Sequence, residues 1–127
     1  MDLQEYFEKH IGSGILATAD ADGNVDLAVY ARPHVKTDST RAFIMRDRLS
    51  HHNLQSNPHA AYIFLEKGQG YSGKRLYLTR LSEDTNPERI AALRRQTKPD
   101  SRPDERKFLV TFSVDRIRPA VGPGDER

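Results

Sequence analysis

The stretch MRDRLSHHNLQSNP, residues 45–58, gathers basic and titratable side chains within a few positions. Arg46 and Arg48 precede Ser50, and two histidines follow it directly. If Ser50 caps a short helix over 51–56, the free amides of the first turn and the positive end of the helix dipole face one point, which the two guanidinium groups can also reach. This arrangement suits a phosphate dianion, although a capped surface helix with two exposed arginines gives the same pattern.

The same stretch gives less support to metal or hydrolase chemistry. His51 and His52 are adjacent, so on a helix they point about 100° apart, whereas zinc needs three or four convergent ligands. A serine hydrolase needs a serine, a base and an orienting acid in contact, and Ser50 has no nucleophile elbow around it. The chain has no cysteine, which excludes disulfides, thiolate metal sites and cysteine nucleophiles. We therefore predict no metal site.

Two further patterns match motifs in their letters only. Residues 68–73, GQGYSG, have the spacing G-x-G-x-x-G, but a dinucleotide fingerprint needs a helix after the third glycine, and the KRLYLTRL that follows alternates like a strand. Residues 87–97 form an arginine-rich predicted helix, which we interpret as a solvated face with Ile90 and Leu93 packed underneath. Because the 20 basic and 18 acidic residues are interspersed, we expect no nucleic-acid partner.

The elements that must position these residues are mainly strands. A first short helix carries Leu3, Tyr6 and Phe7 on one face, and DADGN at 20–24 is a tight-turn signal. Apolar runs and period-two alternation predict six strands, at 15–19, 25–32, 41–45, 59–66, 74–81 and 107–121. In the second of them, apolar Val25, Leu27 and Val29 alternate with more polar residues, which indicates a half-buried strand. Six strands with short connections indicate a small antiparallel barrel with helices at its rim.

Length and composition set the outer limits. The 127 residues suffice for one domain with its own core, which we expect to span 1–127 with a loose tail over 121–127. A hydrophobic fraction of 36% beside 30% charged residues favours sharing some burial with a second copy. No apolar run approaches the roughly 18 residues that span a membrane, and the N-terminus lacks the pattern of a signal peptide. We therefore expect a cytoplasmic protein with no membrane partner.

From about residue 3 to residue 121, the chain resembles the pyridoxamine 5′-phosphate oxidase-like family of FMN-binding split barrels. The resemblance rests on the order of elements and on the segments GILATADADGNVDLAVY, FIMRDRLSHHNLQSNPHAAYIF and GKRLYLTR. Within the second, NLQSNPHAAYIF is similar to the family's short helix that ends in Asn-Pro and enters the next strand. The resemblance implies a mainly β fold, a six-stranded antiparallel split β-barrel of Greek-key type with helices at the rim.

The resemblance also implies a cofactor site. In that family FMN lies between two chains, and its phosphate is held around the turn between the third strand and the short helix. The implied contacts are Arg32, His34, Val35 and Lys36 along the ring system, Met45, Arg46, Arg48, Ser50 and His51 around the phosphate turn, and Lys74 at the start of the GKRL strand.

The implied function is a homodimeric, FMN-dependent oxidoreductase that acts on a small molecule. The strands at 25–32 and 107–121 are the expected dimer contributors, the latter through Phe108, Val110, Phe112 and Val114. Many family members have Ser/Thr-Arg-Lys where this chain has Arg-Leu-Ser, and its ending RIRPAVGPGDER lacks their late substrate arginine and histidine, so vitamin B6 oxidation is not predicted. A non-catalytic flavin-binding protein, or a split barrel that uses haem or a deazaflavin, remains the alternative.

Overall fold

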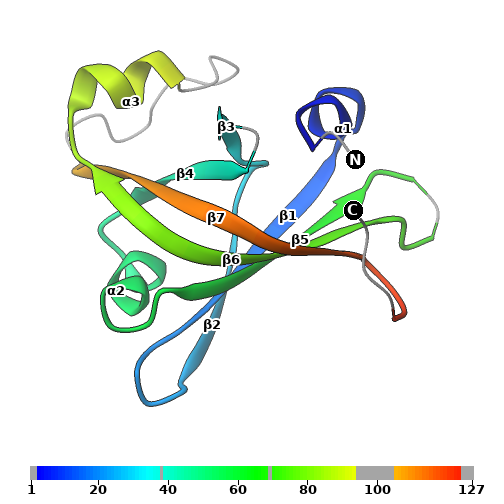
Figure 1. Ribbon diagram of the computed structural model, residues 1–127, viewed down its shortest axis with the longest axis horizontal. Coiled ribbons are helices and arrows are strands. Elements are labelled where there is room, and N and C mark those ends of the chain that lie inside the picture. The colour runs from blue at the N-terminus through cyan, green and yellow to red at the C-terminus, as the bar shows by residue number, and fades with distance from the viewer. Residues whose placement is uncertain (1–2, 38, 69, 94–104, 124–127) are drawn as a thin grey trace.

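The computed structural model describes residues 3–37, 39–68, 70–93 and 105–123, in which seven antiparallel strands form one sheet accompanied by three short helices (Figure 1). In chain order the elements are α1 (Leu3–Lys9), β1 (Gly12–Ala19), β2 (Val25–Val29), β3 (His34–Thr37), β4 (Thr40–Arg46), α2 (Leu49–Ser56), β5 (His59–Glu66), β6 (Gly73–Asp84), α3 (Pro87–Leu93) and β7 (Lys107–Pro119).

The sheet curls without closing. Its order is β2-β1-β5-β6-β7-β4-β3, so β2 and β3 form the two edges and do not pair with each other. Figure 1 shows the long β6 and β7 crossing the middle of the molecule, with α2 and α3 at one end and α1 at the other. This architecture confirms the predicted antiparallel split barrel with helices at its rim.

The structure has seven strands where six are predicted. The predicted strand at 25–32 ends at Val29, and His34–Thr37 forms a separate strand that pairs with β4. Pro33 lies in the connection directly before β3, where its missing backbone N–H cannot take part in a strand ladder.

Alternation along the strands builds the core. Inward-facing side chains of β1, β4, β5, β6 and β7 form the main buried cluster, which α1 closes with the predicted face of Leu3, Tyr6 and Phe7. The Phe7 ring packs edge-on against Phe64 with centroids 5.3 Å apart. A smaller cluster on the other side of the sheet packs Ile90 of α3, with Leu93 beside it, against β4 and β7. The remainder of the predicted 87–97 helix, and most of the expected loose tail, lie outside the described residues.

The predicted tight turn at 20–24 and the predicted strand after the third glycine of residues 68–73 are both present. In DADGN, the Asp20 carboxylate accepts hydrogen bonds from the backbone N–H of Asp22 and of Asn24, both at 2.9 Å, and Gly23 supplies a positive φ of 87°. The glycine-rich segment connects β5 to β6, and the strand that follows Gly73 rules out a dinucleotide fingerprint there. Gly73 is instead required by packing, because a Cβ atom would lie 1.9 Å from a carbonyl oxygen of β5.

The edge strand β2 is half-buried as its alternation indicates, but its apolar side is the exposed one. Val25, Leu27 and Val29 expose 82%, 69% and 83% of their surface. The opposite side of β2, which carries Asp26, faces the inside of the open barrel, and so does Tyr30, the residue directly after the strand. The strand thus presents Val25 and Leu27 to the surroundings, while Asp26 and Ala28 face the interior.

Candidate functional site

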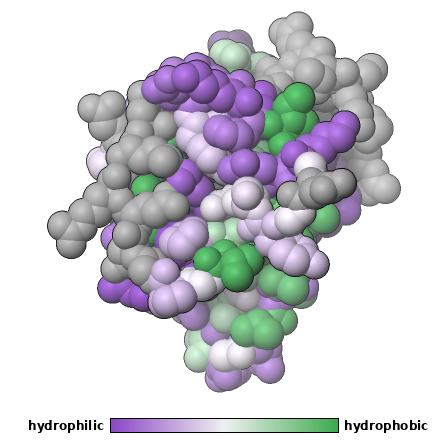
Figure 2. Space-filling view, turned by 90° about the vertical axis from the view of Figure 1, so that its right-hand side faces the viewer, coloured by the Kyte–Doolittle hydropathy of each residue, from purple (hydrophilic) through white to green (hydrophobic). Residues whose placement is uncertain are grey.

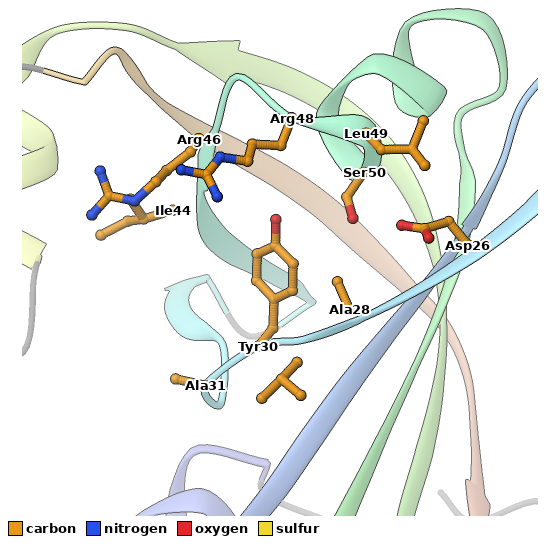
Figure 3. A pocket seen from close by; sticks show the side chains of 10 residues that line it. Asp26, Ala28, Tyr30, Ala31, Ile44, Arg46, Arg48, Leu49 and Ser50 are labelled. Carbon is orange, nitrogen blue, oxygen red and sulfur yellow. The ribbon is translucent and has the colours of Figure 1, made fainter. Parts of the chain in front are cut away.

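A pocket of about 420 Å³ lies between the inner side of β2, the end of β4 and the start of α2 (Figure 3). Its lining residues are Asp26, Ala28, Val29, Tyr30, Ala31, Ile44, Arg46, Arg48, Leu49 and Ser50. The edge strand β2 pairs only with β1, so α2 packs across the opening between β2 and β4 and completes the wall. The volume falls in the range typical of small-molecule sites.

Two hydroxyl groups meet inside this pocket. Figure 3 shows the Tyr30 hydroxyl pointing between Arg48 and Ser50, with the Ser50 hydroxyl directed into the same part of the pocket. Burial raises the pKa of Tyr30, the nearby Asp26 charge adds to that effect, and the Ser50 hydrogen bond and the Arg48 charge oppose it. Tyr30 therefore stays protonated at neutral pH and can donate a hydrogen bond to a ligand.

Arg46 and Arg48 reach the pocket from the end of β4 and from the turn before α2, and both contact Glu105. Arg48 donates from Nε and Nη2 to Oε1 at 3.2 and 3.0 Å, and from Nη2 to Oε2 at 3.2 Å. Arg46 Nη1 lies 3.5 Å from Oε2. The two arginines are thus held together at the rim of the pocket by one shared carboxylate.

Ser50 has a different role from the predicted cap. The helix begins at Leu49, with Arg48 in the N-cap position and no side-chain cap, and the His52 N–H bonds to the Arg48 carbonyl at 2.9 Å. Ser50 consequently sits inside the first turn, 5% exposed, where its hydroxyl faces the pocket. The helix starts two residues earlier than predicted. As a result, the Ser50 hydroxyl does not cap a backbone N–H of the first turn and instead lines the pocket.

Met45 and His51, also predicted to contact the cofactor, point away from the pocket. Met45 is adjacent to Arg46 in β4, so it faces the opposite side of the strand and is fully buried in the core. His51 is adjacent to Ser50 and lies about 100° around the helix, where its ring stacks on Phe108 with centroids 3.8 Å apart.

His51, itself buried, anchors α2 to the sheet through a polar cluster with Glu83 of β6 and Gln55. Its Nε2 lies 2.9 Å from the Glu83 carboxylate, which also accepts a hydrogen bond from Gln55 at 2.6 Å. Burial acts to raise the pKa of Glu83, but the hydrogen bonds from Gln55 and His51, together with the charges of His51 and Arg80, outweigh it and lower the pKa. The cluster therefore holds the helix that carries the pocket residues in a fixed position on β6.

The other five predicted residues lie outside the pocket lining. Arg32 precedes the edge strand β3, which carries the remaining three of that group: His34, Val35 and Lys36. The charge of Lys36 contributes to lowering the pKa of Asp84, so its side chain serves that carboxyl electrostatically. Lys74 is 4% exposed, and its ammonium lies over the Tyr6 ring, 4.8 Å from the centroid, against α1. For these residues, as for Met45 and His51, contact with a cofactor stays a prediction.

Sequence reasoning misses Tyr30, Asp26 and Glu105. The first two stand on the less apolar side of an alternating strand, and that alternation is the signal that would place them on one face. Glu105 follows a polar segment that gives no sign of its partners, which lie 57 and 59 residues earlier in the chain.

The donor set of this pocket fits an anionic ligand group joined to a flat or apolar body. Two guanidinium groups and the Tyr30 and Ser50 hydroxyls supply hydrogen-bond donors, and Arg forks match the oxygens of a phosphate. Ala28, Ile44 and Leu49 supply apolar wall. The residues present are thus compatible with the phosphate and ring of a flavin mononucleotide.

Comparison with known proteins gives matches by structure alone. No family model and no curated protein matches the sequence. An FMN-binding protein from Syntrophomonas wolfei subsp. wolfei superposes with a TM-score of 0.77 at 16% identity, over 97% of this chain and 86% of that one. An F420 reductase gives 0.70 at 14% identity, over 90% and 94%.

A third match is a Clostridium acetobutylicum protein that is related to general stress protein 26 and assigned to the pyridoxinephosphate oxidase family. It superposes with a TM-score of 0.68 at 10% identity, over 98% of this chain and 89% of that one. The strand order, the open edge beside α2 and these superpositions agree: the chain has the split-barrel fold shared by FMN-binding and pyridoxamine 5′-phosphate oxidase-like proteins.

Proposed function

We propose that this protein binds FMN, with its phosphate at Arg46, Arg48 and Ser50, and acts as a homodimeric oxidoreductase on a small molecule. The observation that carries the proposal is the pocket itself, in which these three residues meet at the open edge of a split barrel. The structural match to an FMN-binding protein supports the choice of cofactor.

The dimer is supported by an exposed apolar surface on the outer side of the sheet. In register with the exposed Leu27 and Val29 lie Ala17 and Ile15 of β1, and Ile15 is in turn opposite Ile63 of β5. Figure 2 shows hydrophobic residues gathered in the lower half of the molecule, toward the end where Figure 1 shows β2. Contiguous apolar surface of this kind marks interaction sites, and a second copy presents the same strip in return. We call the side chains of Val25, Leu27 and Val29 the β2 strip.

The second predicted contributor to the dimer is corrected by the structure. Phe108, Val110 and Phe112 of β7 are at most 6% exposed and belong to the core of the protomer. These three side chains therefore serve the inside of the barrel and are not available to a partner, while Val114, the fourth residue of the predicted face, is half-buried.

Bound FMN would supply the redox chemistry, since a flavin transfers electrons that ordinary side chains do not. The chain's own residues bind and orient. Arg46 and Arg48 neutralise the phosphate, the protonated Tyr30 hydroxyl donates a hydrogen bond from the pocket floor, and the His51–Glu83 anchor keeps Ser50 in place. No described side chain is assigned as the general acid or base.

The test is flavin retention combined with a comparison of two ligands. Purified protein mixed with FMN and desalted should keep a flavin absorption band near one per chain. Arg46→Ala and Arg48→Ala should each weaken FMN binding about 10- to 150-fold, because a hydrogen bond to a charged group contributes about 1.5–3 kcal/mol. Riboflavin, which lacks the phosphate, should bind all three proteins alike.

Arg89→Ala is the matched control, since Arg89 is an exposed, ion-paired arginine on α3. Equal losses for both ligands in the pocket variants would mean that these arginines contact the ring or hold the fold. Absence of any flavin binding by the wild type would refute the proposal. Reduction of the bound flavin by a nicotinamide cofactor separates an enzyme from a non-catalytic flavin-binding protein.

A deazaflavin is the second candidate, because the structural matches include an F420 reductase. F420 also carries a phosphate group, so the same arginines would serve it. Parallel titrations with FMN and F420 decide between the two cofactors through their relative affinities.

A further inference from the structure

The two arginines that the proposed function assigns to a phosphate already share an internal anion. Glu105 takes the Nε and Nη2 edge of Arg48, which is the edge of a guanidinium that binds two oxygens side by side. It also pairs with Arg46. A ligand phosphate therefore meets donors that are engaged by a carboxylate of the same chain.

The charges around the pocket also indicate that Glu105 opposes the binding of a phosphate. Arg46 and Arg48 bring two positive charges, and Glu105 and Asp26 bring two negative ones. A phosphate monoester adds about 1.5 to 2 negative charges at neutral pH. Among these four described groups the charges cancel while Glu105 is in place, and displacement of Glu105 leaves a balance of about one positive charge.

We propose that Glu105 is a specificity-determining residue that competes with the ligand's phosphate for Arg46 and Arg48, an inference that rests on the proposed function. Glu105 lies two residues before β7, so its carboxylate stays tethered beside the arginines at high effective concentration. Its side chain is 21% exposed, so it can turn toward solvent when a phosphate replaces it. The preference for phosphorylated over unphosphorylated ligands is consequently smaller than the two arginines alone would give.

The experiment measures FMN and riboflavin affinities by calorimetry for the wild type and Glu105→Gln. The variant keeps the size of the side chain and removes its charge, so FMN should bind about tenfold more tightly and riboflavin equally well. Glu5→Gln removes one carboxylate from the exposed side of α1 and should change neither affinity. In an Arg48→Ala background, Glu105→Gln should have a much smaller effect on FMN, since most of the competed donors are gone.

Unchanged or weaker FMN binding by Glu105→Gln would overturn the inference, because Glu105 would then be holding the arginines ready for the ligand. Titration of inorganic phosphate, followed by ³¹P NMR line broadening, keeps the question separate from flavin binding. If no flavin binds to any of these proteins, the proposed function fails. The phosphate titration then decides the inference alone: tighter binding by Glu105→Gln than by wild type and Glu5→Gln supports it, and equal or weaker binding overturns it.

Discussion

Replacing one residue of the β2 strip should separate the protomers. Leu27 is 69% exposed, and full burial of a leucine side chain is worth about 1.5–3 kcal/mol, so covering the exposed part contributes at most about 1–2 kcal/mol per chain. A two-fold interface contains the residue twice, which gives about 2–4 kcal/mol. Leu27→Asn should therefore raise the dimer dissociation constant about 30- to 700-fold. The amide adds its own desolvation cost, which acts in the same direction.

Sedimentation velocity over a concentration series from nanomolar to micromolar measures this change directly. Leu81→Asn is the matched control, since Leu81 is 56% exposed on β6 and lies outside the β2 strip. The control should associate like the wild type and unfold at a similar temperature. A wild type that sediments as a monomer at micromolar concentration would refute the dimer, and a Leu27→Asn protein as dimeric as the wild type would refute the β2 strip as its interface.

Three further outcomes are expected. Because the pKa of Glu83 is lowered in the folded state, its ionised carboxylate stabilises the fold at pH values above its ordinary pKa of 4.5, and this contribution is lost as the pH falls through the lowered pKa. Glu83→Gln should therefore be less stable than the wild type at neutral pH, and thermal unfolding should show that it loses less stability on acidification. The pKa of Asp84 is held at about 2 chiefly by its hydrogen bond to Arg89, so in Arg89→Ala this pKa should rise toward its ordinary value while the Asn86 backbone hydrogen bond and the Lys36 charge still keep it lowered, as followed by carboxyl NMR shifts. Gly14→Ala should cost about 1–3 kcal/mol in denaturant unfolding, because a Cβ atom would lie 1.8 Å from the Tyr62 hydroxyl, and Tyr62→Phe should recover part of this loss. A Gly14→Ala protein as stable as wild type would show that the close approach at Gly14 is not a constraint on the fold.

Much of the fold can be predicted from short-range features of the sequence. Alternation, the Asp20 turn and the Asn57-Pro58 end of α2 each depend on a few consecutive residues, and each of them is where the sequence predicts it. The sequence does not predict the extra strand because the alternation continues past Val29, and Pro33, directly before His34, is the one local signal that a new strand begins. Element boundaries depend on such single hydrogen bonds more than on composition.

The candidate site can be predicted from the sequence only in part. Arg46, Arg48 and Ser50 share one short stretch, so their proximity is nearly guaranteed by chain geometry. The helix start at Leu49 decides where Ser50 points. This start is set by the backbone hydrogen bond from His52 to Arg48, for which no capping side chain gives a signal in the sequence. Tyr30 reaches the pocket, and Glu105 reaches the arginines at its rim, through the curl of the sheet, which sequence spacing does not encode.

The position of Tyr30 gives this protein a built-in optical reporter. The chain contains five tyrosines and no tryptophan, so tyrosine dominates its intrinsic emission. Tyr30 is the one tyrosine among the described residues that line the pocket, and its ring also packs against Phe43 of the core, with centroids 5.8 Å apart. A chromophore entering the pocket would quench this emission by energy transfer, and Tyr30→Phe would remove the signal contributed at the site. Occupancy of the pocket can therefore be followed by intrinsic tyrosine fluorescence, without a label and without an activity assay.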